Sequence, residues 1–280
     1  MTDAPIDLAN VPLRPAATVM LVRDAATGAG IEVFMLRRTL AAAFAGGMYV
    51  FPGGKVDDAD GTTEIEGIAD GLDDEAASTR LGLASGGLAY WAAAIRECFE
   101  EAGVLMARHA RGDRAGDIVR FDDEHVVDRF EQHRHAVHQG SLSIVDLCER
   151  EQLRLCAGDL AYVSHWITPV GEVRRFDTRF FVARAPQAQE PLHDDGETIE
   201  SLWVAPGEAL ARFRRGELAM IPPTIANLEF LVDHISADAV MVAAHAIPTP
   251  PAILPKLRVN ADGKVVGVVL PDEADYDSLP

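Results

Sequence analysis

Cysteines, aromatic side chains, basic residues and long apolar runs are all scarce in this chain of 280 residues. Its three cysteines, Cys98, Cys148 and Cys156, are too few and too scattered for a disulfide framework or a CxxC metal site, which favours a reducing compartment. The longest apolar stretch, at 239–247, is about half a membrane span. The first residues have neither the basic nor the apolar region of a secretion signal. We therefore expect a cytoplasmic protein with no membrane partner.

Positive charge is also in deficit, because 25 Lys and Arg residues stand against 44 Asp and Glu residues and leave a formal net charge of −19. An acidic surface repels phosphate backbones, so nucleic-acid polymers are disfavoured as partners. Small phosphorylated substrates stay open, since carboxylates can recruit divalent cations that reverse the local charge. Wholesale disorder is excluded, because 48% hydrophobic and 25% charged residues is an ordinary globular composition.

Strand and helix patterns are both present, and they are interleaved. Strands are expected at 15–23, 31–38, 48–51, 160–168, 178–184 and 201–204, and helices at 88–102, 206–215 and 222–235. Two excursions, at 57–87 and about 110–158, have partly helical patterns, and a Pro-rich extension at 247–280 contains a hairpin that turns at Asn260–Gly263. This order favours one α/β domain over 1–280, with helices on both faces of a mixed sheet.

The segment RECFEEAGV at 96–104 has the most informative spacing. On a helix, Glu97, Glu100 and Glu101 stand at i, i+3 and i+4, so three carboxylates share one face. Their mutual repulsion would destabilise an isolated helix, but Mg²⁺ requires oxygen-rich sites of this kind. A solvated acidic face stabilised by Arg96 is the competing interpretation.

Upstream, Phe51-Pro52-Gly53-Gly54 places backbone amides at the exit of an expected strand. With the helix, this loop resembles the Nudix hydrolase signature G-x5-E-x7-R-E-U-x-E-E-x-G-U, where U is a bulky apolar residue. The second half matches throughout 96–104, with Cys98 at the first U position. In the first half, Asp60 stands at the position of the first Glu, and the spacer grows to the 35 residues of 61–95. We interpret 61–87 as an insertion within the motif.

A divided motif behind FPGG resembles the Nudix branch of the peroxisomal-type coenzyme A diphosphatases, and WITP at 166–169 and RFDTRFF at 175–181 are similar to segments of that branch. The resemblance implies a Nudix-type α/β/α sandwich with two helical insertions. It also implies Mg²⁺- or Mn²⁺-dependent hydrolysis of a nucleoside diphosphate derivative, namely coenzyme A, acyl-CoA or a related adenine dinucleotide. ADP-ribose, NADH or a nucleoside triphosphate are alternative substrates, and a non-catalytic nucleotide-sensing module is an alternative of another class. A homodimer stays open.

The resemblance further implies roles for single residues. The expected catalytic group consists of Arg96, Glu97, Glu100 and Glu101. Its three glutamates are the expected metal ligands, together with the Gly53 carbonyl and Glu197 from a later loop. Arg96 orients a carboxylate and has Asp60 as its expected partner. One of the helix carboxylates, or Glu197 or Glu200, is the expected general base.

Substrate contacts are predicted from side-chain chemistry. A guanidinium fork at a strand end can bind phosphate, although a surface ion pair is the competing interpretation for each arginine. Aromatic rings can stack on a base, although a core position competes. The candidates are Arg37, Arg38, Phe51, Gly54, Arg175 and Arg179. The histidines at 133, 135 and 138 lack the i, i+4 spacing of a helical zinc site, and we interpret them as part of a solvated helix.

Overall fold

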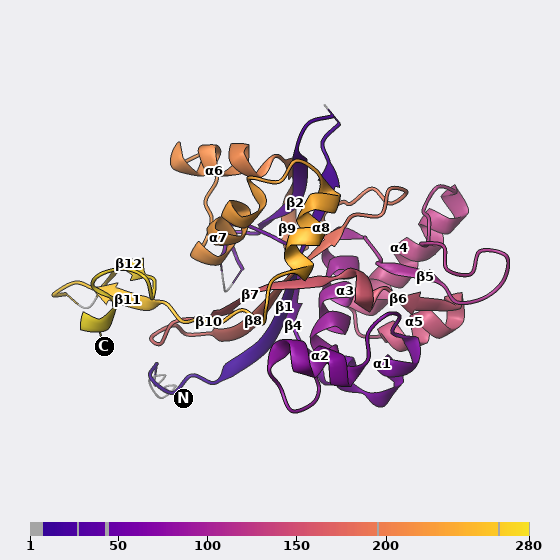
Figure 1. Cartoon of the computed structure of the whole chain (residues 1–280), viewed down its shortest axis with the longest axis horizontal. Helices are drawn as coiled ribbons and strands as arrows, with labels where there is room; N and C mark the ends of the chain where they lie inside the picture. Colours follow the sequence, from indigo (N-terminus) through magenta and orange to yellow (C-terminus); the bar gives the residue numbers. More distant parts are fainter. Residues whose placement is uncertain (1–7, 27, 43–44, 195, 263, 280) are drawn as a thin grey trace.

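An eight-stranded sheet forms the centre of the computed structural model, which describes residues 8–26, 28–42, 45–194, 196–262 and 264–279 (Figure 1). Its main path runs β10-β7-β8-β1-β2-β3, while β4 pairs with β1 and β9 pairs with β2. The strands are β1 (Leu13–Asp24), β2 (Ile31–Arg38), β3 (Tyr49–Val50), β4 (Gly53–Lys55), β7 (Ala161–Ile167), β8 (Arg175–Arg184), β9 (Thr198–Val204) and β10 (Ala252–Ile253).

Strand β1 joins the parallel and antiparallel parts of the sheet. It pairs parallel with β8, from Leu13 opposite Arg175 to Val22 opposite Arg184, and antiparallel with β2 and β4. Most of β1 is apolar on both of its faces, which is typical of a strand covered on both sides. The predicted mixed sheet is confirmed.

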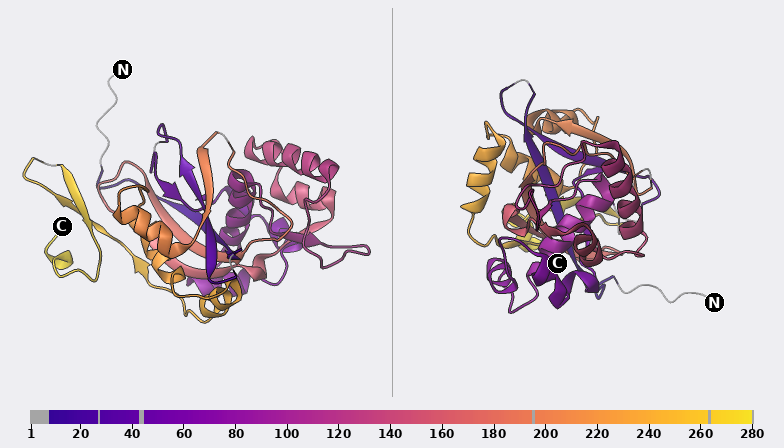
Figure 2. Two further views of the ribbon diagram at one scale, coloured as in Figure 1. Left: turned by 90° about the horizontal axis from the view of Figure 1, so that it is seen from above. Right: turned by 90° about the vertical axis from the view of Figure 1, so that its right-hand side faces the viewer.

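Each face of the sheet has its own core. On one face lies α3 (Leu88–Ala102), whose Trp91 ring packs against Phe181 with ring centroids 4.6 Å apart. On the other face lie α6 (Pro206–Arg214), α7 (Pro222–Leu231) and α8 (Ala237–His245). Figure 2 shows these helices and α3 on opposite sides of the sheet. The predicted α/β/α sandwich is thereby confirmed.

Helix α3 is capped from outside its own sequence. The Asp74 carboxylate accepts hydrogen bonds from the backbone N–H groups of Gly86 and Leu88, which satisfies donors at the first turn. The helix stops at Gly103, whose φ of +68° strains any residue with a Cβ atom. Cys98 is fully buried on the sheet side, and burial raises the pKa of its thiol.

Both excursions contain helices, as predicted. The first has the 3-10 helix η1 (Asp58–Gly61), α1 (Thr63–Ile68) and α2 (Asp74–Leu81), and the second has α4 (Glu124–His138) and α5 (Ile144–Glu151). The second also contains the short pair β5 (Ala107–His109) and β6 (Leu153–Leu155) and the 3-10 helix η2 (Ala157–Asp159), which the sequence patterns did not predict. Figure 1 shows the second excursion beside α3, which α4 contacts. That the whole chain is one domain stays a prediction.

The C-terminal part differs from its prediction in one helix. The expected helix at 222–235 ends at Leu231, because Ser236 caps a separate helix, α8, by accepting a hydrogen bond from Ala239 N–H. Further on, β11 (Lys256–Val259) and β12 (Val265–Val269) form the predicted hairpin, although Gly263 of its turn lies outside the described residues. The hairpin projects from the sheet (Figures 1 and 2), and η3 (Tyr276–Ser278) follows it. No helix among the described residues is long and apolar enough to cross a membrane.

Candidate active site

Arg96 lies at the centre of a buried group of charged side chains, here called the Arg96 cluster (Arg96, Asp60, Glu97 and Glu100). Its guanidinium holds both oxygens of Asp60, since Nε donates to Oδ1 and Nη2 donates to Oδ2, each at 2.9 Å. Nη1 donates to Oε1 of Glu97 at 2.8 Å and of Glu100 at 2.9 Å, and Nη2 also donates to the Lys55 carbonyl at 2.8 Å. Asp60 is 1% exposed and Arg96 is 8% exposed. The expected partnership of these two residues is therefore present.

The position of Asp60 depends on η1, which begins three residues after β4. The Asp60 carboxylate accepts a hydrogen bond from Asp57 N–H at 2.8 Å, as in a capping box. Oδ2 of Asp57 also lies 3.6 Å from Nη2 of Arg96. Because η1 folds the chain back toward α3, an aspartate reaches the guanidinium at this position.

Glu101 faces the glycine loop instead. Its Oε2 accepts a hydrogen bond from Gly53 N–H at 2.9 Å, and the residue is 4% exposed. A Cβ atom on Gly53 would lie 2.5 Å from the Ala17 carbonyl oxygen, and one on Gly54 would lie 2.6 Å from both carboxylate oxygens of Glu97. Glycine at both positions therefore lets β4 approach β1 and the carboxylates of α3 this closely.

The surroundings of Glu97 and Glu101 disfavour the charged forms of their carboxylates. Burial raises the pKa of Glu97 to about 7, against the opposing effect of Arg96. Burial, followed by the charge of Glu97, raises the pKa of Glu101 well above its usual range, although Gly53 N–H and Arg38 oppose the shift. Desolvation disfavours the charged form of a carboxylate, and a bound divalent cation favours it. The residues at this position therefore suit a hard cation.

The candidate ligands lie close together, but their carboxylates point to different partners. Glu97 and Glu100 share Arg96, Glu101 meets Gly53, and Oε2 of Glu100 lies 3.5 Å from Nδ1 of His138. Nowhere in the described part of the chain do three Asp, Glu, His or Cys side chains gather closely enough to hold one ion. Binding an ion would require side-chain rotation, on a helix and loop that are already adjacent.

A second charged group, here called the rim cluster (Arg37, Arg38, Glu197 and Glu200), lies at the ends of β2 and β9. Nη2 of Arg38 is 3.3 Å from Oε2 of Glu197, and Nη1 of Arg38 is 3.7 Å from Oε1 of Glu101. Nη1 of Arg37 is 3.4 Å from Oε2 of Glu200. The side chains of Glu197 and Glu200 are 55% and 48% exposed. Arg38 thus connects the rim cluster to the carboxylate helix.

An Asx-type turn sets the position of Glu197. Asp194 accepts hydrogen bonds from the backbone N–H groups of Glu197 and Thr198 and from the Thr198 hydroxyl. β9 begins at Thr198, whose backbone is opposite Arg38 in β2. The turn and the register together bring a glutamate from the later loop to the edge of the site.

Three of the predicted substrate contacts make internal interactions in this structure, and their role in substrate binding stays a prediction. Nε of Arg175 donates to the Thr168 carbonyl at 3.1 Å, and Arg179, 4% exposed, contacts Asp177. Phe51 is 2% exposed and packs in the core on the face opposite α3. Phe51 therefore occupies a core position, which was the competing interpretation of an aromatic residue in a strand.

Two residues of α4 were missed by the sequence analysis. Arg134 is 5% exposed and contacts the end of α3, and His138, expected on a solvated helix, lies near Glu100. A signal for Arg134 existed, because Phe130, Arg134 and Val137 share one face of α4 and all are buried. The charged residue on this otherwise apolar face indicated a buried partner.

A cavity of about 750 Å³ lies away from both clusters. Met106, Val119 and Met241 contribute its apolar wall, and Arg120 also lines it. None of the predicted site residues lines it. The cavity and the motif therefore indicate different parts of the molecule.

Comparison with known proteins gives matches at the levels of family, sequence and fold. The family model described as the NUDT19 Nudix domain matches residues 72–231, which is more than half of the chain. The acyl-coenzyme A diphosphatase NUDT19 of Gallus gallus is 28% identical over 235 residues, covering 70% of this chain and 60% of that protein. Its Homo sapiens counterpart is 26% identical over 266 residues, covering 84% and 70%.

A solved structure extends this likeness to the fold. The NUDIX hydrolase from Alicyclobacillus acidocaldarius is 28% identical, with a TM-score of 0.69, and covers 86% of this chain and 100% of its own. The chain spans about 60% of the length of the Gallus gallus and Xenopus laevis relatives. The matched range 72–231 contains RECFEEAGV but not 51–60, whose relation to the helix rests on the contacts described above.

Proposed function

The chain belongs to the NUDT19 Nudix family, and from this premise we propose that it is a divalent-metal-dependent hydrolase of a diphosphate linkage in coenzyme A, acyl-CoA or a related adenine dinucleotide. The observation that supports this most directly is the contact of Glu101 with Gly53 N–H at 2.9 Å. It brings the carboxylate helix against the glycine loop although the first excursion separates them in sequence. The curated relatives named above are acyl-coenzyme A diphosphatases, which points to the same substrate class.

The proposed ligands of Mg²⁺ or Mn²⁺ are Glu97, Glu100 and Glu101, with the Gly53 carbonyl and Glu197. Such an ion would neutralise charge on the diphosphate and lower the pKa of an attacking water. Nudix hydrolases generally need divalent metal ions, and the choice between the two is part of the proposal.

The side chains around the ligands have proposed roles that need no ion. Arg96 fixes the rotamers of Glu97 and Glu100 through Nη1. Arg37 and Arg38 present guanidinium groups at the open edge, where they would bind the anionic diphosphate. A helix carboxylate, or Glu197 or Glu200, would accept the proton of the water whose oxygen attacks phosphorus. The bond from phosphorus to the leaving phosphate oxygen then breaks, and coenzyme A would give 3′,5′-ADP and a phosphopantetheine-type product.

Neither the location nor the assembly of the protein follows from the site. A cytoplasmic location and a homodimer therefore stay predictions. A non-catalytic nucleotide-sensing module could dispense with the three carboxylates of α3, and their presence favours the enzyme. ADP-ribose, NADH and nucleoside triphosphates are the alternative substrates.

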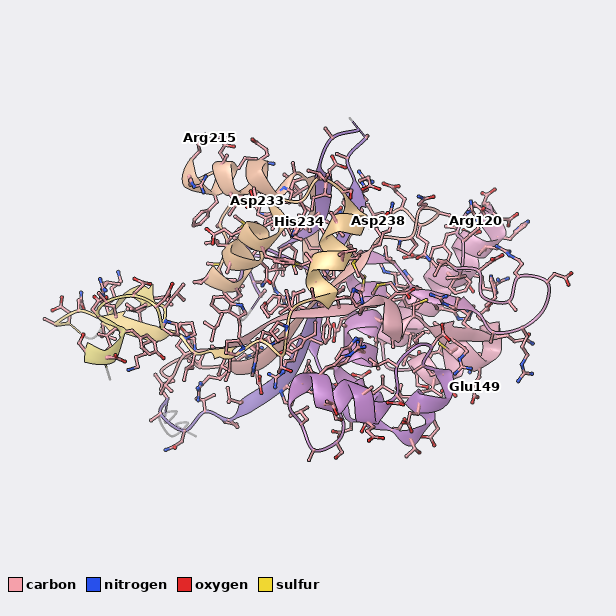
Figure 3. The ribbon with its side chains drawn as sticks, in the orientation of Figure 1. Arg120, Glu149, Arg215, Asp233, His234 and Asp238 are labelled. Atoms are coloured by element: carbon pink, nitrogen blue, oxygen red, sulfur yellow. The ribbon has the colours of Figure 1, made fainter. Side chains whose placement is uncertain are left out.

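The test is a substrate panel combined with two variants and a control. Coenzyme A, acyl-CoA, NADH, ADP-ribose and nucleoside triphosphates are incubated with Mg²⁺ or Mn²⁺, and products are identified by mass. Glu100→Gln and Glu101→Gln should each lower kcat/KM on the order of 10²–10³-fold. Glu149→Gln, an exposed residue of α5 (Figure 3), should leave it unchanged.

Folding of the variants is followed by urea unfolding. Glu101→Gln removes a charge whose burial is unfavourable, so this variant should not lose stability in the absence of metal. Full activity in both variants would overturn the site assignment. A wild-type protein that binds a nucleotide but cleaves no member of the panel would favour the sensing module.

A further inference from the structure

Arg134 is a buried cation that no Nudix signature position accounts for. It lies on α4, within the second excursion, and is 5% exposed. Arginine is rarely buried to this extent unless its donors are satisfied. Nε donates to the carbonyl of Glu100 at 2.9 Å, and Nη2 donates to the carbonyls of Glu101 and Leu192, each at 3.1 Å. Nη1 lies 3.6 Å from the Glu131 carboxylate.

Two of these carbonyls belong to the last turn of α3, which ends at Ala102. The last four carbonyls of a helix have no partner within the helix, and a cation near that end also favours the helix dipole. The same peptide units carry the Glu100 and Glu101 side chains. Arg134 therefore restrains the backbone from which two proposed metal ligands project.

Gly103 provides the space for this contact. A Cβ atom at this position would lie 3.2 Å from Nη1 of Arg134, and the φ of +68° already disfavours other residues. The glycine of the RECFEEAGV segment thus both ends the helix and admits a guanidinium from the insertion.

The third carbonyl extends the restraint to the rim cluster. Leu192 is fastened to the end of α3 twice, because its N–H donates to the Ala102 carbonyl at 3.0 Å and its own carbonyl accepts from Arg134. Two residues later, Asp194 begins the turn that holds Glu197. The Glu197 carboxylate meets Arg38, which also lies near Glu101.

We propose that Arg134 is a positioning residue that holds the end of α3 and Leu192 in one fixed relation, so that Glu101 and Glu197 stay within reach of the same ion and substrate. The inference rests on the proposed function. It makes the second excursion part of the scaffold of the active site, although none of its residues needs to touch substrate.

The experiment compares Arg134→Met and Arg134→Lys in the full chain. The methionine variant keeps an unbranched apolar side chain but donates no hydrogen bond. Its kcat should fall about 10–100-fold, and the Mn²⁺ concentration for half-maximal activity should rise about 10-fold, with little change in KM. Lysine has three donors and a positive charge, so Arg134→Lys should recover most of both losses.

Arg154→Met is the matched control. Arg154 also belongs to the second excursion and donates to a backbone carbonyl, that of Ala69, at 2.7 Å, but it has no contact with α3 or with 192–197 among the described contacts. This variant should lose some stability in urea and keep wild-type kcat and Mn²⁺ dependence. If Arg134→Met behaves in the same way, Arg134 has only a structural role and the proposal is wrong.

Two further measurements keep the outcome decisive. Asp194→Ala tests the same link from a half-buried residue, and it serves as the second variant if Arg134→Met does not fold. It should raise the Mn²⁺ requirement, and an unchanged requirement would contradict the link. Mn²⁺ affinity measured by calorimetry needs no turnover. A wild type that binds Mn²⁺ without cleaving any substrate would remove the proposed hydrolase function, and the loss of affinity in Arg134→Met would still decide the role of Arg134.

Discussion

The Arg96 cluster and the rim cluster consist of the same chemical groups, guanidinium and carboxylate, in different surroundings. In the first, Arg96 makes contacts of 2.8–2.9 Å to three carboxylates that are almost entirely buried. In the second, the arginine–glutamate distances are 3.3 and 3.4 Å, and the glutamates are about half exposed. Charge pairs interact more strongly where water is excluded. One cluster is therefore fixed, whereas the other can exchange partners at little cost.

This difference matches the two tasks of a site for a metal and a diphosphate. The backbone that carries an ion's ligands must be held in place even if their side chains rotate on binding, while groups that bind a diphosphate must release their resting partners first. Arg38 belongs to both regions, because it lies near Glu101 on one side and Glu197 on the other. The comparison predicts that changes in the first cluster affect folding and activity together, and that changes to Arg37 at the rim affect substrate binding with little effect on folding.

The largest effect is expected from Arg96→Met, which would break the fixed cluster. Three buried carboxylates would lose their cation, so the free energy of unfolding should fall by about 3–5 kcal/mol. Hydrolysis should be abolished. Urea unfolding monitored by circular dichroism measures the free energy of unfolding, and the substrate panel measures hydrolysis.

Arg215→Met is the control for this variant. Arg215, on the surface at the end of α6 (Figure 3), also contacts two glutamates, Glu208 and Glu217. Because these groups are exposed, stability should hardly change. Equal losses in the two variants would show that burial does not distinguish the clusters.

A second effect is expected in the pH dependence of the metal-free protein. Burial raises the pKa of Glu97 from 4.5 to about 7, so between these values the folded state binds more protons than the unfolded state. The contribution of Glu97 to the free energy of unfolding therefore falls as pH rises through this window. Subtracting the pH profile of Glu97→Gln from that of the wild type isolates the contribution, and saturating Mg²⁺ should reduce it. A difference profile that is flat or rises with pH would contradict the unfavourable burial of this charge.

The smallest effect is expected from Arg37→Ala at the rim. KM for the diphosphate substrate should rise roughly 10-fold while kcat changes less than about 2-fold, because the contact serves ground state and transition state alike. The free energy of unfolding should change by less than about 0.5 kcal/mol. Arg120→Ala, which removes another exposed arginine paired with one carboxylate, Asp122, should change neither KM nor kcat. A drop in kcat at constant KM would place Arg37 in the fixed group instead.

Local patterns were sufficient for the parts of the site that lie on one element. Helical spacing placed Glu97, Glu100 and Glu101 on one helix, whereas the contact of Asp60 with Arg96 joins two elements and was expected from the resemblance to the Nudix signature. The β2–β9 register, which brings Arg37 and Arg38 to Glu200 and Glu197, depends on tertiary pairing and was not predicted.

Long-range contacts account for the side-chain positions that local patterns did not predict. The apolar face that Arg134 shares with Phe130 and Val137 indicates that it is buried, but nothing nearby in sequence identifies its partner as the end of a helix more than thirty residues away. Arg175, Arg179 and Phe51 carry the chemistry of substrate contacts, but the sheet buries them on internal partners. In each case the side-chain type indicates which contacts the residue can make, and tertiary packing decides toward which partner the side chain points.

The contact of Asp60 with Arg96 also closes the 35-residue loop 61–95 at its base. The entropy cost of closing a loop grows only with the logarithm of its length, so lengthening a seven-residue spacer to 35 residues costs about 1.4 kcal/mol. Burial of Ile65, Ile68 and Leu81 from α1 and α2 offsets a cost of this size. The spacer could therefore lengthen or shorten with little thermodynamic consequence, as long as its two ends still meet. A search that fixes the number of residues between the two halves of such a motif would overlook chains that assemble the same groups in space.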